Sequence, residues 1–306
     1  MQEVVVVEAP LSFIIPDIAG DDSLAVAGYK ALRHRYAQLG GRDAWTLTSL
    51  ADATPMRIAQ LDATVRRMRN DGRLFESGFR PKNIKPVLRH IRDLHAQLSR
   101  THQSIAQLAL LDDYVQRCDE DARAGLTPLM DAWQSQADER RVMLIASLND
   151  DLHQEWLERM DVVSTGDATV AARPIDPGEP SHVRHIMRAA IEARLRDVRA
   201  FDTLPDAPTP DQIDALRQAI ERLSYTAETL ASAMPNGLPA QLIAACHAAL
   251  DIYTPICSAH DAVENARRFA TKQHMASNGP QTFADAQTRV IEASLLDWRK
   301  FLQPFL

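Results

Sequence analysis

Apolar residues at helical spacing organise this chain, and the clearest example is the stretch LDATVRRMRNDGRLF at residues 61–75. Its apolar positions recur at intervals of three or four, as one buried face of an α-helix requires, and they are Leu61, Val65, Met68, Gly72 and Phe75. The same spacing returns 155 residues later, in LRQAIERLSYTAETL at residues 216–230. Two copies of one helical pattern predict an internal repeat, and hence a fold of two related helical units.

Similar periodicity, with glycine and proline at its ends, predicts helices through most of the remaining chain. We expect them at about 24–39, 46–52, 56–76, 83–98, 103–123, 127–161, 183–202, 211–233, 238–253, 256–274 and 283–303. Residues 1–20 combine a β-branched run with Pro10 and Pro16, which indicates an extended arm. Residues 164–182 contain three prolines and two glycines without any period, which indicates a linker.

These elements predict an all-α protein made of two pseudo-symmetric antiparallel four-helix bundles. The predicted boundaries place the N-terminal arm at 1–20, the first bundle at 21–163, the linker at 164–182 and the second bundle at 183–306. The chain has 306 residues, of which 45% are hydrophobic, and this is enough to build two packed cores.

The charge is unevenly distributed along the chain. The formal net charge of −7 excludes a globally basic nucleic-acid-binding protein, yet residues 55–100 hold 11 Lys and Arg against 4 Asp and Glu. Such a basic segment in an acidic protein is a candidate anion-binding site. No aromatic residues alternate with these arginines, so we do not expect specific nucleic-acid binding.

The residues offer little support for catalysis or metal binding. The clearest Glu-x-x-His spacing, Glu179–His182, falls in the expected linker, and Cys118, Cys246 and Cys257 have no metal-like spacing. Neither an HExxH nor a GxxxxGK[ST] motif occurs, so zinc hydrolase and P-loop chemistry are unsupported. We therefore expect a protein that is not an enzyme and has no cofactor or metal.

Targeting signals are also lacking in the sequence. No apolar stretch approaches the roughly 18–20 residues that span a bilayer, and the apolar start of the chain lacks the basic segment of a signal peptide. An odd number of cysteines without such a peptide favours a reducing compartment. We therefore expect a cytoplasmic protein that makes no membrane contact.

Basic residues run beside the apolar faces of several predicted helices. They are Arg66, Arg67, Arg69 and Arg73 on the helix at 56–76, Lys85, Arg89 and Arg92 on the helix at 83–98, and Lys30 and Arg33 on the helix at 24–39. Guanidinium groups bind phosphate oxygens through two parallel hydrogen bonds and stay charged at any physiological pH, so these rows suit a linear polyanion. Arginine stems also cover apolar surface, or pair with acidic helices of the same chain. The residues alone leave these two interpretations equally open.

From about Asp21 onward the chain resembles the CHAD family, α-helical domains that bind inorganic polyphosphate. The resemblance is strongest in YKALRHRYAQL, LDATVRRMRNDGRLFES, KNIKPVLRHIRDL, RPIDPGEPSHVRHIMRAAIEARLRDVRAFD and IDALRQAIERLSYTAETL, which occur in the family's order. It implies a pair of four-helix bundles with internal pseudo-symmetry, whose basic side chains line a central groove. It also implies that polyphosphate binds in this groove.

The family's basic positions are only partly retained. The namesake histidines are replaced by Ala59 and Asp214, and three further basic positions hold Asp62, Glu221 and Ser224. We take as the candidate polyphosphate-binding set the retained positions, the basic row on the following helix, and two residues at the start of the helix from 183. This set comprises Lys30, Arg33, Arg66, Arg67, Arg69, Arg73, Lys85, Arg89, Arg92, Arg184, His185, Arg217 and Arg222.

Two hypotheses follow from the partial loss of the family's basic positions. The first is a non-enzymatic, cytoplasmic protein that binds polyphosphate or a similar phosphate polyanion, with free polyphosphate or a polyphosphate granule as its partner. The second is a degenerate member that acts as an interaction or scaffold module with a protein partner. In the repeat, Asp62 stands at the position of Arg217, and Glu221 at that of Arg66. If pseudo-symmetry brings these residues together, salt bridges fill the former groove.

Overall fold

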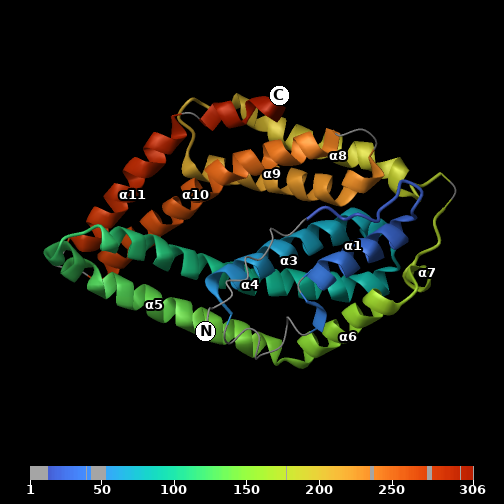
Figure 1. Ribbon diagram of the computed structural model, residues 1–306, viewed down its shortest axis with the longest axis horizontal. Helices are drawn as coiled ribbons and strands as arrows, with labels where there is room; N and C mark the ends of the chain where they lie inside the picture. Colours follow the sequence, from blue (N-terminus) through green and yellow to red (C-terminus); the bar gives the residue numbers. More distant parts are fainter. Residues whose placement is uncertain are drawn as a thin grey trace, which may run out of the picture.

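The computed structural model describes residues 13–38, 40–42, 53–176, 178–234, 238–273, 278–296 and 298–305 (Figure 1). Within these ranges every regular element is a helix and the β-bridges are isolated pairs, which confirms the predicted all-α fold class. Residues 1–12 of the predicted arm and the helix expected at 46–52 lie outside the described residues. Residues 13–20 are not helical, and Ile15 and Ile18 among them are buried.

The helices of the first half are α1 (Leu24–Gln38), α3 (Pro55–Phe75), η2 (Glu76–Gly78), α4 (Pro81–Gln116), α5 (Glu120–Leu148), α6 (Asp151–Thr165) and α7 (Ala168–Ala171). α4 is continuous where the sequence predicts two helices, because Leu98, Thr101 and Ser104 carry its buried face across the expected gap. The single helix predicted at 127–161 is instead divided between α5 and α6. Asp150 begins α6 by accepting a hydrogen bond from the backbone N–H of Leu152 at 3.1 Å.

The helices of the second half are α8 (Val183–Arg199), η3 (Ala200–Thr203), α9 (Pro210–Leu230), η4 (Ala231–Ala233), α10 (Leu238–Gln273), α11 (Gly279–Leu295), η5 (Trp298–Phe301) and η6 (Gln303–Phe305). α10 passes through Pro255, where the sequence predicts a break between two helices. Tyr253 and Ile256 flank this proline and are buried in the same core. Their packing keeps the helix continuous, although Pro255 has no N–H to donate to the preceding turn.

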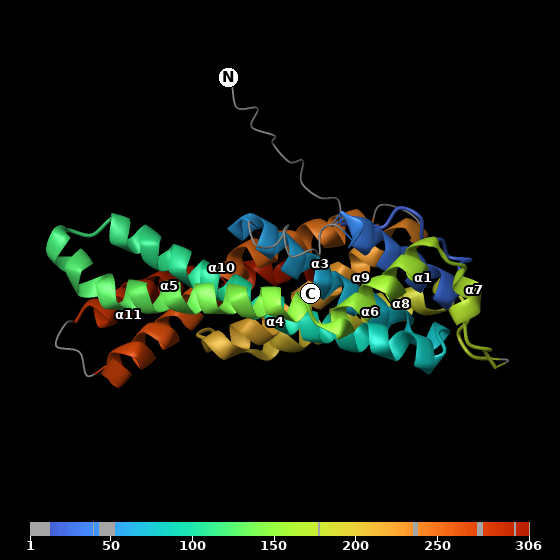
Figure 2. The same cartoon turned by 90° about the horizontal axis from the view of Figure 1, so that it is seen from below.

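The repeat predicted from the sequence corresponds to α3 and α9. Each helix has 21 residues, begins with a proline, and is capped by a threonine, Thr54 or Thr209, whose hydroxyl accepts a backbone N–H. The two helices contact each other in the middle of the molecule (Figure 2). Equivalent positions of the two copies can therefore meet.

Two hydrophobic cores hold the helices together. One lies among α1, α3, α4 and α6 and includes Phe75 and Trp156, and it also takes in Leu230 from α9. The other lies among α9, α10 and α11, and it takes in Leu111 of α4 and Trp133 of α5. α4, α5, α10 and α11 accordingly meet at one end of the molecule, at the left of Figure 1. Helices of each half thus contribute to both cores, and the domain boundaries at 163 and 183 stay a prediction.

In the described part of the chain, one helix is long and apolar enough to cross a membrane by length and composition alone. It is the part of α10 from Pro239 to Lys272. The core helix of a globular protein meets the same criterion, and α10 packs along both α9 and α11. Its Tyr253 and Ala262 are fully buried in the second core. We therefore describe α10 as a core helix.

Candidate anion-binding groove

Three adjoining hollows follow α3 along its length. The basic hollow, of about 270 Å³ between α3 and α4, is lined by Arg69, Arg73, Lys85, Arg89 and Arg92 together with Glu76 and Leu88. The central hollow, of about 400 Å³, lies between α3 and α9 and shares Arg69 and Arg73 with the basic hollow. The acidic hollow, of about 450 Å³, shares Arg66, Arg217 and Glu221 with the central hollow. These shared residues make the three hollows one groove.

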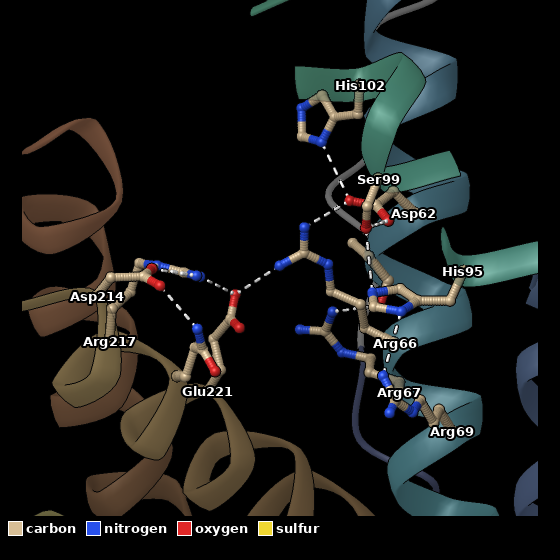
Figure 3. A network of polar contacts seen from close by, with 12 residues as sticks. Asp62, Arg66, Arg67, Arg69, His95, Ser99, His102, Asp214, Arg217 and Glu221 are labelled. Carbon is tan, nitrogen blue, oxygen red and sulfur yellow. Dashed lines mark hydrogen bonds and ion pairs between the residues drawn. The ribbon is translucent and has the colours of Figure 1, made fainter. Parts of the chain in front are cut away.

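A chain of ion pairs connects α3 to α9 in the middle of the groove (Figure 3). Arg66 contacts Asp62 at 2.7 Å on its own helix and Glu221 at 3.1 Å on α9. Arg217 in turn contacts Glu221 at 2.8 Å and Asp214 at 2.7 Å. Arg66 and Glu221 occupy equivalent positions of the repeat, as do Asp62 and Arg217. The sequence predicts salt bridges because an acidic residue of one copy stands where the other copy has a basic residue. These salt bridges are present in the structure.

Asp62 is buried but stays ionised because of the donors around it. It accepts hydrogen bonds from Arg66 at 2.7 Å and from the Ser99 hydroxyl at 2.7 Å, and it lies 3.1 Å from Nδ1 of His102. Burial alone would raise its pKa, but the bonds to His102, Arg66 and Ser99 outweigh burial and lower the pKa to about 2. Asp62 thus keeps the charge of Arg66 compensated at neutral pH.

This lowered pKa predicts an acid-dependent loss of stability. The folded pKa of Asp62 lies below its ordinary value of 3.8, so its stabilising contribution is complete above that value and is lost as pH falls toward 2. We expect the contribution to be roughly 2 kcal/mol in the free energy of unfolding. Urea unfolding at a series of pH values should show that Asp62→Asn flattens this dependence.

Asp131→Asn, which changes an exposed aspartate on α5, is the matched control. An equal effect of both substitutions on the free energy of unfolding between about pH 4 and pH 2 would contradict the role given to Asp62.

Arg67 does not line the groove, although the sequence predicts it as part of the binding set. Its guanidinium forms a bidentate pair with Glu228, at 2.7 and 3.1 Å, and lies 4.5 Å from the centre of the Tyr225 ring. Only 6% of Arg67 is exposed, and Glu228 is fully buried. Despite that burial, His247 and Arg67 lower the pKa of Glu228 to about 2. Arg67 is therefore an internal partner of a carboxylate.

The basic hollow contains positive charges that the protein does not compensate. Within the described chain, Arg69, Arg73, Lys85 and Arg89 have no carboxylate within 4.0 Å, and Arg92 pairs only with its exposed neighbour Asp93 at 2.8 Å. Burial, followed by the like charges of Arg73 and Arg92, lowers the pKa of Arg69. The like charges of Arg73 and Arg92 beside Arg69 create a positive potential, which attracts an anion.

The central hollow adds hydrogen-bond donors that have no acceptor. Nε of Arg66, Nε of Arg69 and Nδ2 of Asn70 are buried without a hydrogen-bond partner in the described part of the chain, and all three side chains line this hollow. An unsatisfied buried donor costs about 1–3 kcal/mol. These atoms are buried from solvent, so a bound anion reaches them only when the side chains that line the hollow shift.

The acidic hollow has the opposite character. Asp211, Asp214 and Asp261 line it in addition to Asp62 and Glu221. Its arginines are Arg66 and Arg217, which are already paired. Burial and then the nearby Asp214 raise the pKa of Asp261, against the hydrogen bond from Gln103. The groove therefore changes from positive at one end to negative at the other.

Four predicted residues lie elsewhere, within α1 and at the start of α8. Lys30 pairs with Asp22 at 2.8 Å, and Arg184 pairs with Asp21. Arg33 reaches the Val163 carbonyl at 3.4 Å, and His185 accepts the backbone N–H of Ser181 at 3.2 Å. None of these four residues lines the three hollows.

The structure also shows lining residues that the sequence analysis does not select. Arg194 of α8 and Asn70 of α3 line the central hollow together with the predicted Arg217 and Arg222. The arginines of α8 are spread around more than one face of the helix, so the sequence gives no signal that Arg194 faces the groove. For metals, no group of three or more His, Cys, Asp or Glu in the described ranges is arranged to hold an ion.

Comparisons with known proteins agree with this architecture. The sequence model of the CHAD domain family matches residues 30–269. The crystal structure of the CHAD domain from the plant Ricinus communis superposes with a TM-score of 0.72 and 17% identity, covering 97% of each chain. PptA from Streptomyces chartreusis gives a TM-score of 0.69 and 14% identity, covering 92% of this chain and 100% of its own. No curated protein matches the sequence. At these identities the two structures show the fold alone.

Proposed function

Because this chain belongs to the CHAD domain family, which is known to bind polyphosphate, we propose that it binds inorganic polyphosphate through the basic and central hollows. One observation carries the proposal. Arg69, Arg73, Lys85 and Arg89 lie together without a carboxylate partner in the described chain. Two further arginines of the groove, Arg66 and Arg217, are compensated by acids of the protein itself.

The chemistry of this surface suits a chain of phosphates. Arginine binds phosphate oxygens through two parallel N–H···O bonds, and lysine adds a compact charge with three donors. Arg222 of α9 extends the positive surface across the central hollow. Arg194 of α8 also lines this hollow, where it pairs with Asp197 at 3.3 Å. A linear polyanion along α3 can therefore contact both the basic and the central hollow.

We propose that the protein acts by binding alone, in the cytoplasm and at polyphosphate granules. CHAD domain proteins are generally non-catalytic binding modules. The basic and central hollows are lined largely by cations and hydrogen-bond donors, which suit holding an anion in place.

Binding is expected to depend steeply on salt. Four or five phosphate contacts release a similar number of counterions, so the logarithm of the association constant should fall with the logarithm of salt concentration at a slope of about −3. Isothermal titration calorimetry with unlabelled long-chain polyphosphate measures this slope. An absence of binding at low salt, where charges are screened least, would refute the proposed function.

A second function is favoured by the ion pairs that fill the middle of the groove. Arg66 and Arg217 are paired with Glu221, Asp62 and Asp214, as expected for a degenerate member that serves as an interaction module. This alternative predicts that polyphosphate does not bind even at low salt. A protein partner would then be the ligand to seek.

A further inference from the structure

One carboxylate oxygen connects the two walls of the groove between the central and acidic hollows. Oε1 of Glu221 accepts hydrogen bonds from Arg66 of α3 at 3.1 Å and pairs with Arg217 of α9 at 2.8 Å. Figure 3 shows Glu221 lying between the two guanidinium groups. The three side chains are mostly buried, with 26%, 17% and 14% of Arg66, Glu221 and Arg217 exposed. This bridge, Arg66–Glu221–Arg217, crosses from one wall of the groove to the other.

The two sides of the bridge differ in charge. On the side of the basic hollow are Arg69, Arg73 and the donors of the central hollow that have no partner. On the far side are Asp62, Asp211, Asp214 and Asp261, which would repel a phosphate. A phosphate chain that enters from the basic hollow therefore meets both an ion pair and a field of its own sign. We therefore expect the phosphate chain to end at the bridge.

The end of a polyphosphate chain differs chemically from its interior. A terminal phosphate has three non-bridging oxygens and a second ionisation near neutral pH, whereas an interior phosphate has two such oxygens and a single charge. The central hollow gathers cationic donors, because Arg69 and Arg73 of α3 and Arg222 of α9 all line it. At its wall, Nε of Arg66, Nε of Arg69 and Nδ2 of Asn70 are buried without a partner in the described chain. More acceptor oxygens and more charge at the chain end match this surplus of donors.

We propose that the central hollow receives the end of a polyphosphate chain, with the bridge closing the groove to the rest of the chain, so that the protein recognises chain ends. This inference rests on the proposed function and specifies which part of the polymer is bound. The interior phosphates next to the end lie in the basic hollow, against Arg73, Lys85 and Arg89.

The number of proteins bound per chain separates end recognition from binding along the chain. We would titrate short and long unlabelled chains of defined length and measure the stoichiometry by calorimetry and sedimentation. End recognition predicts no more than two proteins per chain at either length. A stoichiometry that grows in proportion to length would overturn the inference and leave the proposed function standing. No binding of either chain would refute the proposed function itself.

Blocking the chain ends provides a second, independent readout. A long chain with both terminal phosphates converted to phosphoramidates keeps nearly all of its charge but loses the free ends. We expect its affinity to be at least about ten times lower than that of the unmodified chain, because a charge-assisted hydrogen-bond set is lost. Equal affinities for the two chains would overturn the inference.

Glu221→Gln tests the bridge with little change in shape. Removing this charge weakens both ion pairs. We therefore expect more proteins to bind each long chain, and a smaller loss of affinity when the chain ends are blocked. Glu192→Gln, which changes an exposed glutamate on α8 that pairs with Arg188, is the matched control. A folded Glu221→Gln protein, checked by circular dichroism, with the stoichiometry of the wild type would show that the bridge does not close the groove.

Discussion

Replacing Arg73 and Arg89 together by alanine is expected to weaken polyphosphate binding by about 10- to 100-fold. Both side chains are exposed, line the basic hollow from different helices, and lack a carboxylate partner in the described chain. Their charge is therefore available to a ligand. The loss of two phosphate contacts should also make the salt dependence shallower, by about 1.4 in the slope. Calorimetric titration at several salt concentrations measures both effects.

The control for this variant removes two arginines that lie outside the groove. Arg117 directly follows α4 and Arg159 lies on α6; both are exposed, and each pairs with an acid four residues earlier. Arg117→Ala/Arg159→Ala changes the net charge by the same amount. If both double variants lost affinity equally, long-range charge rather than the basic hollow would account for binding.

Replacing Arg67 by alanine is expected to destabilise the protein by about 3–5 kcal/mol, because it leaves a buried carboxylate without its guanidinium partner. Glu228 would keep the Ser224 hydroxyl at 3.1 Å and His247 at 3.0 Å as donors. Neither replaces the bidentate contact with Arg67. Urea unfolding at neutral pH measures the change in free energy.

A double-mutant cycle identifies the cause of this loss. Adding Glu228→Gln to Arg67→Ala removes the uncompensated charge, so the double variant should be less destabilised than the sum of the two single variants. Arg117→Ala, at an exposed pair, should cost less than about 1 kcal/mol. Additive effects of the two buried substitutions would contradict the pairing of Arg67 with Glu228.

The sequence predicts much of the architecture because its signals are local or repeated. Short stretches of consecutive residues show the apolar spacing of α3 and α9 and the threonine–proline pair at the start of each helix. Comparing the two copies even predicts that Arg66 can meet Glu221, since exchanged charges at equivalent positions attract once the copies pack together. The breaks expected within α4 and α10 are wrong, because buried faces continue through both places and outweigh local signals such as Pro255.

Which arginines face the groove was decided by the tertiary structure. Arg66, Arg67 and Arg69 lie within one turn of α3, and the sequence gives all three the same role. Successive residues of a helix point about 100° apart. α9 packs against α3 in such a way that Arg67 meets the buried Glu228, Arg66 meets Glu221, and Arg69 faces the basic hollow.

The sequence by itself thus determined the helical fold, the repeat and the supply of basic residues, because each depends on spacing along one helix or on comparing two copies. Only the tertiary structure decided how those charges are used. Whether an arginine is compensated depends on the carboxylates that another helix brings within about 4 Å, and that distance depends on packing between segments some 155 residues apart. The same packing left Arg69, Arg73, Lys85 and Arg89 with positive charge available for an anion.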